Sequence, residues 1–311
     1  MIFRLDSSLI DKAYAHVLAS CLRQISEKKH KIDYDNPAVW EFVETQVLTT
    51  ANLGTDDINL IRCNLELRDI QNTDRNYYRE VLVGFKIGMV DLNTLSIILN
   101  TASCIVLENS TYDWCVIKRW LEFVKNDPCY KDVNRKVCDA VCRKWIIPEH
   151  AGGGNGTISQ RIGNLVANTY FGAGQLKITT IYDSDKISST DAADHNAALK
   201  KYLSENGYKG HEWDKREIEN YIPLRIYKNA NLVNKDKTEP DKTPSVWDYT
   251  CIDKHPYFKK RYKKDKMPKL VEWIDKAAVK EAFSAMSYIN PVDNHPISEL
   301  QYVIFLLAKY I

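Results

Sequence analysis

Two aspartates, separated by a single serine, follow an apolar and β-branched run of the chain. Residues 178–181 lead through Tyr182 into Asp183 and Asp185. In an open α/β sheet ligands bind at the carboxyl ends of the strands, so a strand here would carry both carboxylates to a binding edge. Two carboxylates held together repel one another unless a divalent cation lies between them. The alternative is an Asp-Ser-Asp turn that caps the following helix, because Asp and Ser favour turns and helix starts.

A third acid follows another strand-like run. Residues 103–107 are rich in apolar and β-branched side chains, and Glu108 comes directly after them. If both runs are parallel strands of one sheet, Glu108 meets Asp183 and Asp185 at the same edge. Carboxylates are the hard oxygen ligands that Mg²⁺ and Mn²⁺ prefer. A lone acid after a strand is usually a solvated turn residue, but three in one block predict a divalent-metal site.

A second pair of acids, Glu217 and Glu219, lies in the segment REIENYIP at 216–223. On a strand their side chains would share one face, whereas on a helix they would point about 200° apart. Asn220 and Tyr221 beside them suggest a tight local arrangement. Acids two residues apart are ordinary on protein surfaces, so this pair gains weight only from what surrounds it.

A glycine-rich turn precedes a predicted helix that starts at Thr157. The turn contains Gly152, Gly153, Gly154 and Asn155. No Lys-Ser/Thr pair follows the glycines, which argues against a nucleoside triphosphatase loop, and the G-x-G-x-x-G spacing of a dinucleotide site is absent. Backbone N–H groups before a helix can still contact a phosphate. A simple strand-to-helix turn explains the glycines about equally well.

The most basic stretch of the chain is KHPYFKKRYKKDKMPK at 254–269. Its lysines and arginine alternate with aromatic residues, a pattern that suits a phosphate backbone with stacked bases. A solvated helix face or loop is the alternative. The residues that we expect to contact nucleic acid are Lys259, Lys260, Arg261, Lys263, Lys264 and Lys266.

Composition bounds the class of protein. The 311 residues are 44% hydrophobic and 27% charged, as in a folded globular protein. The net charge of +2 is nearly neutral, so any affinity for nucleic acid must come from local basic patches. The N-terminus lacks an apolar core of signal-peptide length, and the apolar run 302–308 is too short to span a bilayer. We therefore expect a cytoplasmic protein that does not enter membranes.

Three regions are expected along the chain. Residues 1–101 read as a helical N-terminal domain, and strand-like runs alternate with helical patterns over 102–228, which predicts an α/β domain with a parallel sheet flanked by helices. Residues 229–311 read as a basic, mainly helical C-terminal region. The helices expected in the first region lie at 7–27, 37–53 and 77–88.

Other chemistries find little support. The eight cysteines have no regular framework, and Cys138 and Cys142 fall in a helical stretch without a Cys-x-x-Cys knuckle, so buried reduced thiols are favoured over a zinc site. The seven histidines form no HExxH or similar spacing. No G-x-S-x-G elbow supports a serine hydrolase.

Together, Glu108, the glycine turn, Asp183-x-Asp185 and REIENYIP resemble a Toprim domain, and more narrowly the Toprim nucleases of the OLD (overcoming lysogenisation defect) type found in bacterial phage defence. The resemblance covers roughly residues 102–225. It implies that Glu108, Asp183 and Asp185 hold one or two Mg²⁺ or Mn²⁺ ions. Glu219, with Glu217, would be a second-metal ligand or would hold ligating waters.

The sequence departs from the family at the first motif. Relatives usually read E-G-x-T/S-D/E, but here Asn109 follows Glu108 and one more residue precedes Asp113. Whether Asp113 is a ligand is therefore left open.

The resemblance implies a divalent-metal-dependent endonuclease that hydrolyses phosphodiester bonds of DNA or RNA, with tRNA among its candidate substrates, as an effector of anti-phage defence. Topoisomerase chemistry would need a catalytic tyrosine in a separate domain, for which little of the chain remains. The alternative from a different class is a non-catalytic Toprim-like module that binds a partner ATPase or sensor.

Overall fold

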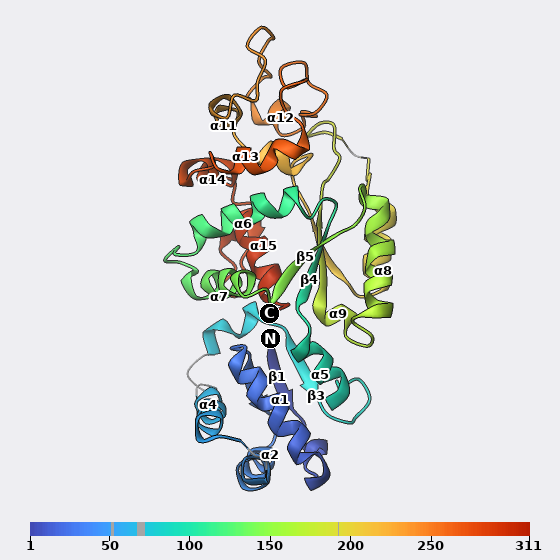
Figure 1. Cartoon of the computed structure of the whole chain (residues 1–311), viewed down its shortest axis with the longest axis vertical. Helices are drawn as coiled ribbons and strands as arrows, with labels where there is room; N and C mark the ends of the chain where they lie inside the picture. The colour runs from blue at the N-terminus through green and yellow to red at the C-terminus, as the bar shows by residue number, and fades with distance from the viewer. Residues whose placement is uncertain (51–52, 67–71, 192) are drawn as a thin grey trace.

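The computed structural model describes residues 1–50, 53–66, 72–191 and 193–311, and its strands form two parallel sheets and a short hairpin (Figure 1). The first sheet has the order β2-β1-β3 and the central sheet the order β5-β4-β6-β7. The strands are β1 (Ile2–Leu5), β2 (Lys31–Tyr34), β3 (Glu80–Val83), β4 (Ser103–Leu107), β5 (Ile146–His150), β6 (Ile178–Tyr182), β7 (Lys209–Glu212), and the antiparallel β8 (Tyr288–Ile289) and β9 (Pro296–Ile297).

The N-terminal region contains helices, but they pack on a parallel sheet that the sequence did not predict. The helix expected at 77–88 is wrong, because this stretch contains β3, in which Val81 and Val83 are buried and their neighbours are exposed. The helix expected at 7–27 begins only at Ala15, after two 3₁₀ turns. The helices are α1 (Ala15–Glu27), α2 (Pro37–Phe42), the π-helix Val43–Val47, α3 (Leu48–Thr50), α4 (Thr55–Glu66) and α5 (Leu92–Asn100). Residues 51–52 of the expected helix at 37–53 lie outside the described residues.

The central sheet confirms the expected alternation of strands and helices. Strands β4 and β6 are buried along their whole length, as expected for inner strands of a parallel sheet. The hydroxyl groups of Thr179 and Thr180 in β6 donate to the carbonyl oxygens of Lys209 (2.9 Å) and Val106 (2.8 Å), so these buried side chains keep their hydrogen bonds. The helices of this region are α6 (Tyr112–Val124), α7 (Lys131–Cys142), α8 (Ile158–Asn168), α9 (Gly174–Lys177) and α10 (Ala197–Glu205).

Helices cover both faces of the central sheet (Figure 1). On one face, α8 and α10 pack against Cys104 and Val106 of β4. On the other face, α6 and α7 pack against Ile105 and Leu107, together with the C-terminal region. Successive side chains of β4 therefore lie in two different hydrophobic cores, one on each face of the sheet.

The order of the strands locates a crevice. From β4 the chain passes to β5 on one side, and it then returns across the sheet to β6 on the other side of β4. At such a reversal of strand order, the loops leaving the two neighbouring strands diverge, and ligands bind between them at the carboxyl ends. In this chain the reversal lies between β4 and β6.

The C-terminal region wraps over α6 and α7 (Figure 1). Less than half of residues 229–311 is helical, so the expectation of a mainly helical region is wrong, and long loops join the short helices. The helices from Leu224 onward are α11 (Leu224–Asn229), α12 (Pro244–Trp247), α13 (Met267–Val271), α14 (Lys276–Ala282) and α15 (Glu299–Ala308). Among the described residues, no helix combines the length and apolar character that crossing a membrane requires.

Candidate functional site

Glu108 lies at the crevice between β4 and β6. The register pairs Leu107 of β4 with Ile181 of β6, so the residues after the two strands lie at the same edge of the sheet. One carboxylate oxygen of Glu108, Oε1, is buried and has no hydrogen-bond partner among the described residues. The backbone N–H of Asp183 favours the ionised form of the Glu108 carboxyl and so acts to lower its pKa. Glu108, the first of the predicted acids, thus lies at the predicted edge of the sheet, and its Oε1 is free of hydrogen bonds to the described residues.

The Asp-Ser-Asp turn is held by hydrogen bonds from two other segments. Asp183 is only 8% exposed, and its Oδ1 accepts a bond of 3.0 Å from the backbone N–H of Ile218. The side-chain amide of Asn196 donates to the Asp183 carbonyl at 2.9 Å, and Ser184 Oγ donates to the Lys215 carbonyl at 2.8 Å. These bonds fix the direction in which Asp183 leaves the strand.

The alternative role of this turn, as a helix cap, does not match the structure. The next helix, α10, begins at Ala197 and has no side-chain cap. Asp185 instead adopts the left-handed backbone conformation, with φ of 58°, and its N–H donates to the Arg216 carbonyl at 3.1 Å. A positive φ is uncommon outside glycine, so the turn is bent in a way that separates Asp185 from the strand direction. Its side chain is exposed, whereas that of Asp183 is buried.

The acids of REIENYIP diverge because their segment is a 3₁₀ helix, Ile218–Tyr221. Glu217 is its N-cap, forms a capping box with Asn220, and receives a hydrogen bond from Arg216 Nε at 3.2 Å. Glu219 is fully buried, and its Oε2 has no hydrogen-bond partner among the described residues. The structure therefore brings the Glu219 carboxylate to the site, whereas the Glu217 carboxylate caps the 3₁₀ helix and pairs with Arg216.

Asp113 lies with these acids, although its sequence position left open whether it belongs to the site. It lies in the first turn of α6, and its Oδ2 accepts a hydrogen bond of 3.1 Å from the Asn109 backbone N–H. The side chain of Asn109 in turn accepts bonds from the N–H groups of Thr111 and Tyr112, both at 3.2 Å. The asparagine that departs from the family pattern thus organises the start of α6. We call Glu108, Asp113, Asp183, Asp185 and Glu219 the acid cluster.

The electrostatics show that these carboxylates act on one another. Burial and then the charge of Asp185 raise the pKa of Glu108 to about 7. Burial and then Glu219 raise the pKa of Asp113 to about 7 as well. The pKa of Asp183 is raised well above its ordinary value by burial and then by Glu108, and burial raises that of Glu219. The acid cluster carries excess negative charge in a poorly hydrated place.

One lysine of the basic stretch reaches the acid cluster. Lys264 Nζ lies 3.6 Å from Glu219 Oε1, which also accepts a hydrogen bond of 3.3 Å from the Tyr262 hydroxyl. Burial disfavours the ammonium ion, but the carboxylates of Glu219 and Asp183 outweigh this and raise the pKa of Lys264. Lys264 is therefore a cation at the site, and the sequence did not distinguish it from its basic neighbours.

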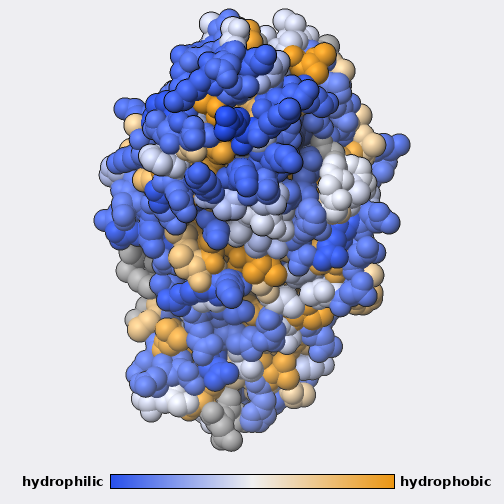
Figure 2. Space-filling view, turned by 45° about the horizontal axis from the view of Figure 1, so that its top comes forward, coloured by the Kyte–Doolittle hydropathy of each residue, from blue (hydrophilic) through white to orange (hydrophobic). Residues whose placement is uncertain are grey.

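The expected base-stacking aromatic surface is wrong. Tyr257, Phe258 and Tyr262 are at most 3% exposed and belong to the hydrophobic core. The remaining basic side chains are exposed. The face of the molecule that Figure 2 shows is mostly hydrophilic. These exposed residues are Lys259, Lys260, Arg261, Lys263 and Lys266.

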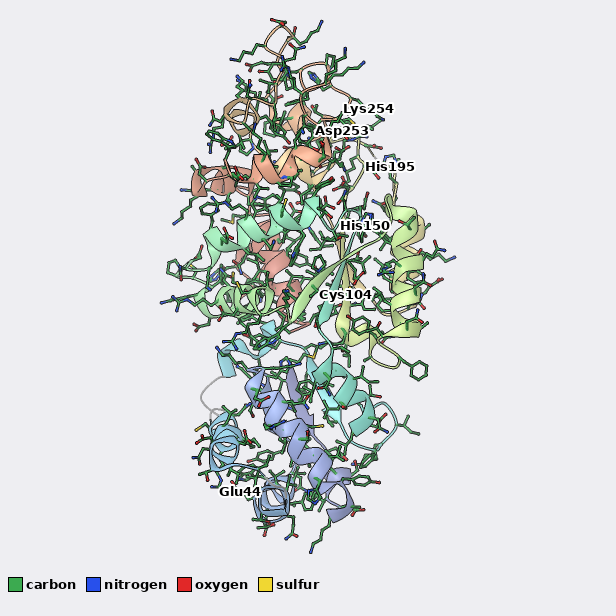
Figure 3. The ribbon with its side chains drawn as sticks, in the orientation of Figure 1. Glu44, Cys104, His150, His195, Asp253 and Lys254 are labelled. Atoms are coloured by element: carbon green, nitrogen blue, oxygen red, sulfur yellow. The ribbon has the colours of Figure 1, made fainter. Side chains whose placement is uncertain are left out.

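The glycine-rich turn lies at the same edge of the sheet. It follows β5, and Ala151 N–H donates to the carbonyl of Leu107, one residue before Glu108, at 2.9 Å. Figure 3 shows His150 toward this end of the sheet and Cys104 toward the other. Gly152, Gly153 and Gly154 have φ values of 104°, 96° and 79°, conformations that favour glycine. The side chain of Asn155 lies outside the described residues.

The acid cluster fits a hard divalent cation in chemistry and charge. Its ligand atoms are carboxylate oxygens, and two of them, Glu108 Oε1 and Glu219 Oε2, are buried without a partner among the described residues. Within the described ranges, however, no three Asp, Glu, His or Cys side chains stand close enough to hold one ion as they are arranged. Side-chain rotation would therefore be needed to complete a coordination shell.

No family model, no curated protein and no solved structure matches this chain. The fold and the site together define an α/β protein with a parallel four-stranded sheet and an acid cluster at the reversal of its strand order.

Proposed function

We propose that this protein is a divalent-metal-dependent endonuclease that hydrolyses phosphodiester bonds of DNA or RNA. The observation that carries the proposal is the acid cluster itself: it lies where the strand order reverses, beside one lysine, and two of its buried carboxylate oxygens, Glu108 Oε1 and Glu219 Oε2, have no hydrogen-bond partner among the described residues. The resemblance of its motifs to Toprim nucleases of the OLD type supports the same chemistry. A cytoplasmic role in anti-phage defence belongs to this proposal.

Glu108, Asp183 and Asp185 would hold Mg²⁺ or Mn²⁺, because they supply oxygen ligands from two neighbouring strand ends. Such an ion, when bound, neutralises the phosphodiester charge and lowers the pKa of a water molecule. The chain's own contribution is to orient these carboxylates. The Ile218 N–H, for example, fixes Asp183 through a hydrogen bond of 3.0 Å to its Oδ1.

Lys264 would stabilise charge on the phosphate during the reaction. Its ammonium is protonated at neutral pH, since the surrounding carboxylates raise its pKa. Glu219, whose carboxylate also accepts a hydrogen bond from the Tyr262 hydroxyl, holds Lys264 at the edge of the acid cluster. A fixed cation at this position favours a phosphate group whose negative charge grows in the transition state.

The exposed basic residues beside Lys264 would bind the nucleic-acid backbone. Lys259, Lys260 and Arg261 are exposed in the same loop segment, and lysine and arginine side chains neutralise phosphates without reading base sequence. The glycine turn presents its backbone from the opposite side of the crevice, next to β5. We therefore propose binding that is independent of base sequence.

The test is to incubate the purified chain with plasmid DNA, single-stranded DNA and tRNA, in Mg²⁺ and in EDTA. We expect cleavage of at least one substrate in Mg²⁺, none in EDTA, and loss of cleavage in Asp183→Ala. Asp132→Ala, which changes an exposed acid in the first turn of α7, is the matched control and should cleave normally. Cleavage that persists in Asp183→Ala would rule out the proposed site.

A second candidate function is a non-catalytic module that binds a partner ATPase or sensor. It is favoured by the absence, among the described residues, of three acids at coordinating distance. Calorimetric titration with Mn²⁺ separates the two functions. The nuclease requires Mn²⁺ binding that Glu108→Gln and Asp183→Asn weaken, whereas a chain that binds no Mn²⁺ at millimolar concentration would favour the module.

A further inference from the structure

A cavity lies on the side of the central sheet away from the acid cluster, where the N-terminal region meets the sheet and α15. Its volume is about 490 Å³, and it is bordered by Arg79, Lys209 at the start of β7, and Lys309 at the end of α15. We call it the junction cavity. Lys209 pairs with Thr179 of β6, and Asp183 follows four residues later, about 13 Å along the strand at 3.3 Å per residue. The junction cavity is thus separate from the proposed nuclease site.

The charge of the junction cavity is uniformly positive. Arg79, Lys209 and Lys309 come from three distant parts of the sequence, and none of the described residues that line the cavity is acidic. Arg79 Nη1 donates to the Gln175 carbonyl at 2.6 Å, which orients its guanidinium group. Three cations around one hollow repel one another, and an anion between them relieves this repulsion. The cavity therefore favours a ligand with at least one phosphate or a similar anionic group.

The rest of the wall is aromatic. Tyr78 and Tyr302 line the cavity with the buried Tyr310 behind them. Tyr302 stacks on Tyr288 with ring centroids 4.6 Å apart, and Lys136 Nζ lies 3.9 Å from the centre of the Tyr78 ring. These contacts hold the rings in place. Flat rings next to cations are the combination that recognises a nucleobase and its phosphate together.

We propose that the junction cavity binds a mononucleotide, with its phosphate at Arg79, Lys209 and Lys309 and its base against the tyrosines. The volume lies within the range of about 300–1,000 Å³ that small-molecule sites occupy. The ligand would contact the N-terminal region, the central sheet and α15 at once, so its binding would stabilise their mutual arrangement. This site goes beyond the proposed nuclease and does not depend on it.

The test is calorimetric titration of the whole chain in EDTA with 5′-AMP, 5′-GMP and 5′-UMP, and separately with inorganic phosphate and with adenosine. We expect saturable binding of at least one mononucleotide, weaker binding of phosphate alone, and weaker binding of the nucleoside. Lys209→Ala and Lys309→Ala should each weaken nucleotide binding at least tenfold. Lys280→Ala, an exposed lysine in the last turn of α14, should leave it unchanged.

Several results would overturn the proposal. They are no saturable binding of any of the three mononucleotides, equal affinity for nucleotide and inorganic phosphate, or unchanged affinity in both Lys209→Ala and Lys309→Ala. The side chain of Lys209 is exposed, so its removal should leave the fold intact, and a circular dichroism melt of each variant checks this. Because EDTA excludes metal-dependent cleavage, a negative result here leaves the nuclease proposal untouched.

Discussion

Each carboxylate of the acid cluster can bind a proton or contribute an oxygen ligand to a metal cation. Glu108 and Asp113 are buried among other carboxylates, and this raises the pKa of each to about 7. Lys264 supplies one positive charge, from a position nearest Glu219. In the metal-free protein these carboxylates are therefore either protonated at low pH, or ionised at higher pH and repelling one another.

The free energy of unfolding of the metal-free protein should fall as pH rises from about 4.5 to 7.5. Glu108 and Asp113 have a higher pKa in the folded chain than their ordinary values of 4.5 and 3.8, so the folded state binds more protons in this window. Stability is then lost as those protons leave. The loss due to Glu108 alone is about 3 kcal/mol, since its pKa rises from 4.5 to about 7 and each tenfold change in proton affinity is about 1.4 kcal/mol. Urea unfolding in EDTA at several pH values measures it.

Glu108→Gln provides the comparison for this pH effect. The amide cannot ionise, so the variant should lose less stability between pH 4.5 and 7.5 than the unmodified chain. Saturating Mg²⁺ should also reduce the loss in the unmodified chain, because a bound cation offsets the repulsion. An identical pH dependence in the variant and the unmodified chain would contradict the assignment of the effect to Glu108.

Lys264→Ala should lower cleavage by about 100-fold or more, because a fixed positive charge near the reacting phosphate is lost. The fold should survive, since Glu219 already has a raised pKa and can take up a proton in place of the ion pair. Lys266→Ala removes a neighbouring cation that we expect only to contact the nucleic-acid backbone, and it should lower cleavage much less than Lys264→Ala: Lys266 is exposed in the same 3₁₀ turn and pairs with Asp265 at 3.6 Å. Equal cleavage rates for the two variants would show that Lys264 has no special role.

The positions of single side chains could be predicted from the sequence where the residue directly follows a strand. Glu108 and Asp183 lie at the expected edge because each comes directly after a buried strand. Lys264 was only one of several similar basic residues, since nothing local marks which lysine folds back onto the sheet. Asp113 stayed open because its place depends on how Asn109 starts α6.

Among the elements, the strands of the central sheet could be predicted because inner parallel strands read as short apolar runs. Strand β3 could not, because it is only four residues long and the stretch that contains it also fits a helix. The segment at 218–221 is neither strand nor α-helix, and in its 3₁₀ geometry Glu219 is buried while Glu217 caps the helix. Hydrogen bonds from Asn220 to Trp247 and Thr250, which lie far along the sequence, hold this segment in place.

Asn220→Ala should destabilise the protein and displace Glu219. The Asn220 amide donates to the carbonyls of Trp247 at 2.7 Å and Thr250 at 2.9 Å, and its oxygen accepts from Glu217 N–H at 3.0 Å. Truncation leaves these groups unpaired, mostly in the interior, at a cost of about 3 kcal/mol. Urea unfolding measures the cost. Asn93→Ala, on the exposed side of α5, should change stability by less than about 0.5 kcal/mol, and a similar value for Asn220→Ala would contradict the argument.

The whole molecule places different partners at the two edges of the central sheet. The carboxyl edge, with the acid cluster, faces the C-terminal region that supplies Lys264, and the other edge faces the N-terminal sheet (Figure 1). The sequence predicted the central sheet but neither the N-terminal sheet nor these pairings. They depend on contacts between residues more than 90 positions apart, such as Arg79 with Gln175 or Ser103 with Tyr310, which no local pattern records.

The salt dependence of binding tests whether the nucleic-acid backbone lies along the exposed basic residues beside Lys264. A double substitution, Lys259→Gln with Lys260→Gln, removes two exposed cations beside Lys264. The slope of log affinity against log salt concentration should become shallower by about 1.8 for duplex DNA or about 1.4 for a single strand, since each phosphate contact contributes about 0.9 or 0.7. Fluorescence anisotropy in EDTA measures it without cleavage. The matched pair Lys12→Gln with Lys29→Gln, exposed in the N-terminal region, should leave the slope unchanged, and equal slopes for both double variants would place the nucleic acid elsewhere.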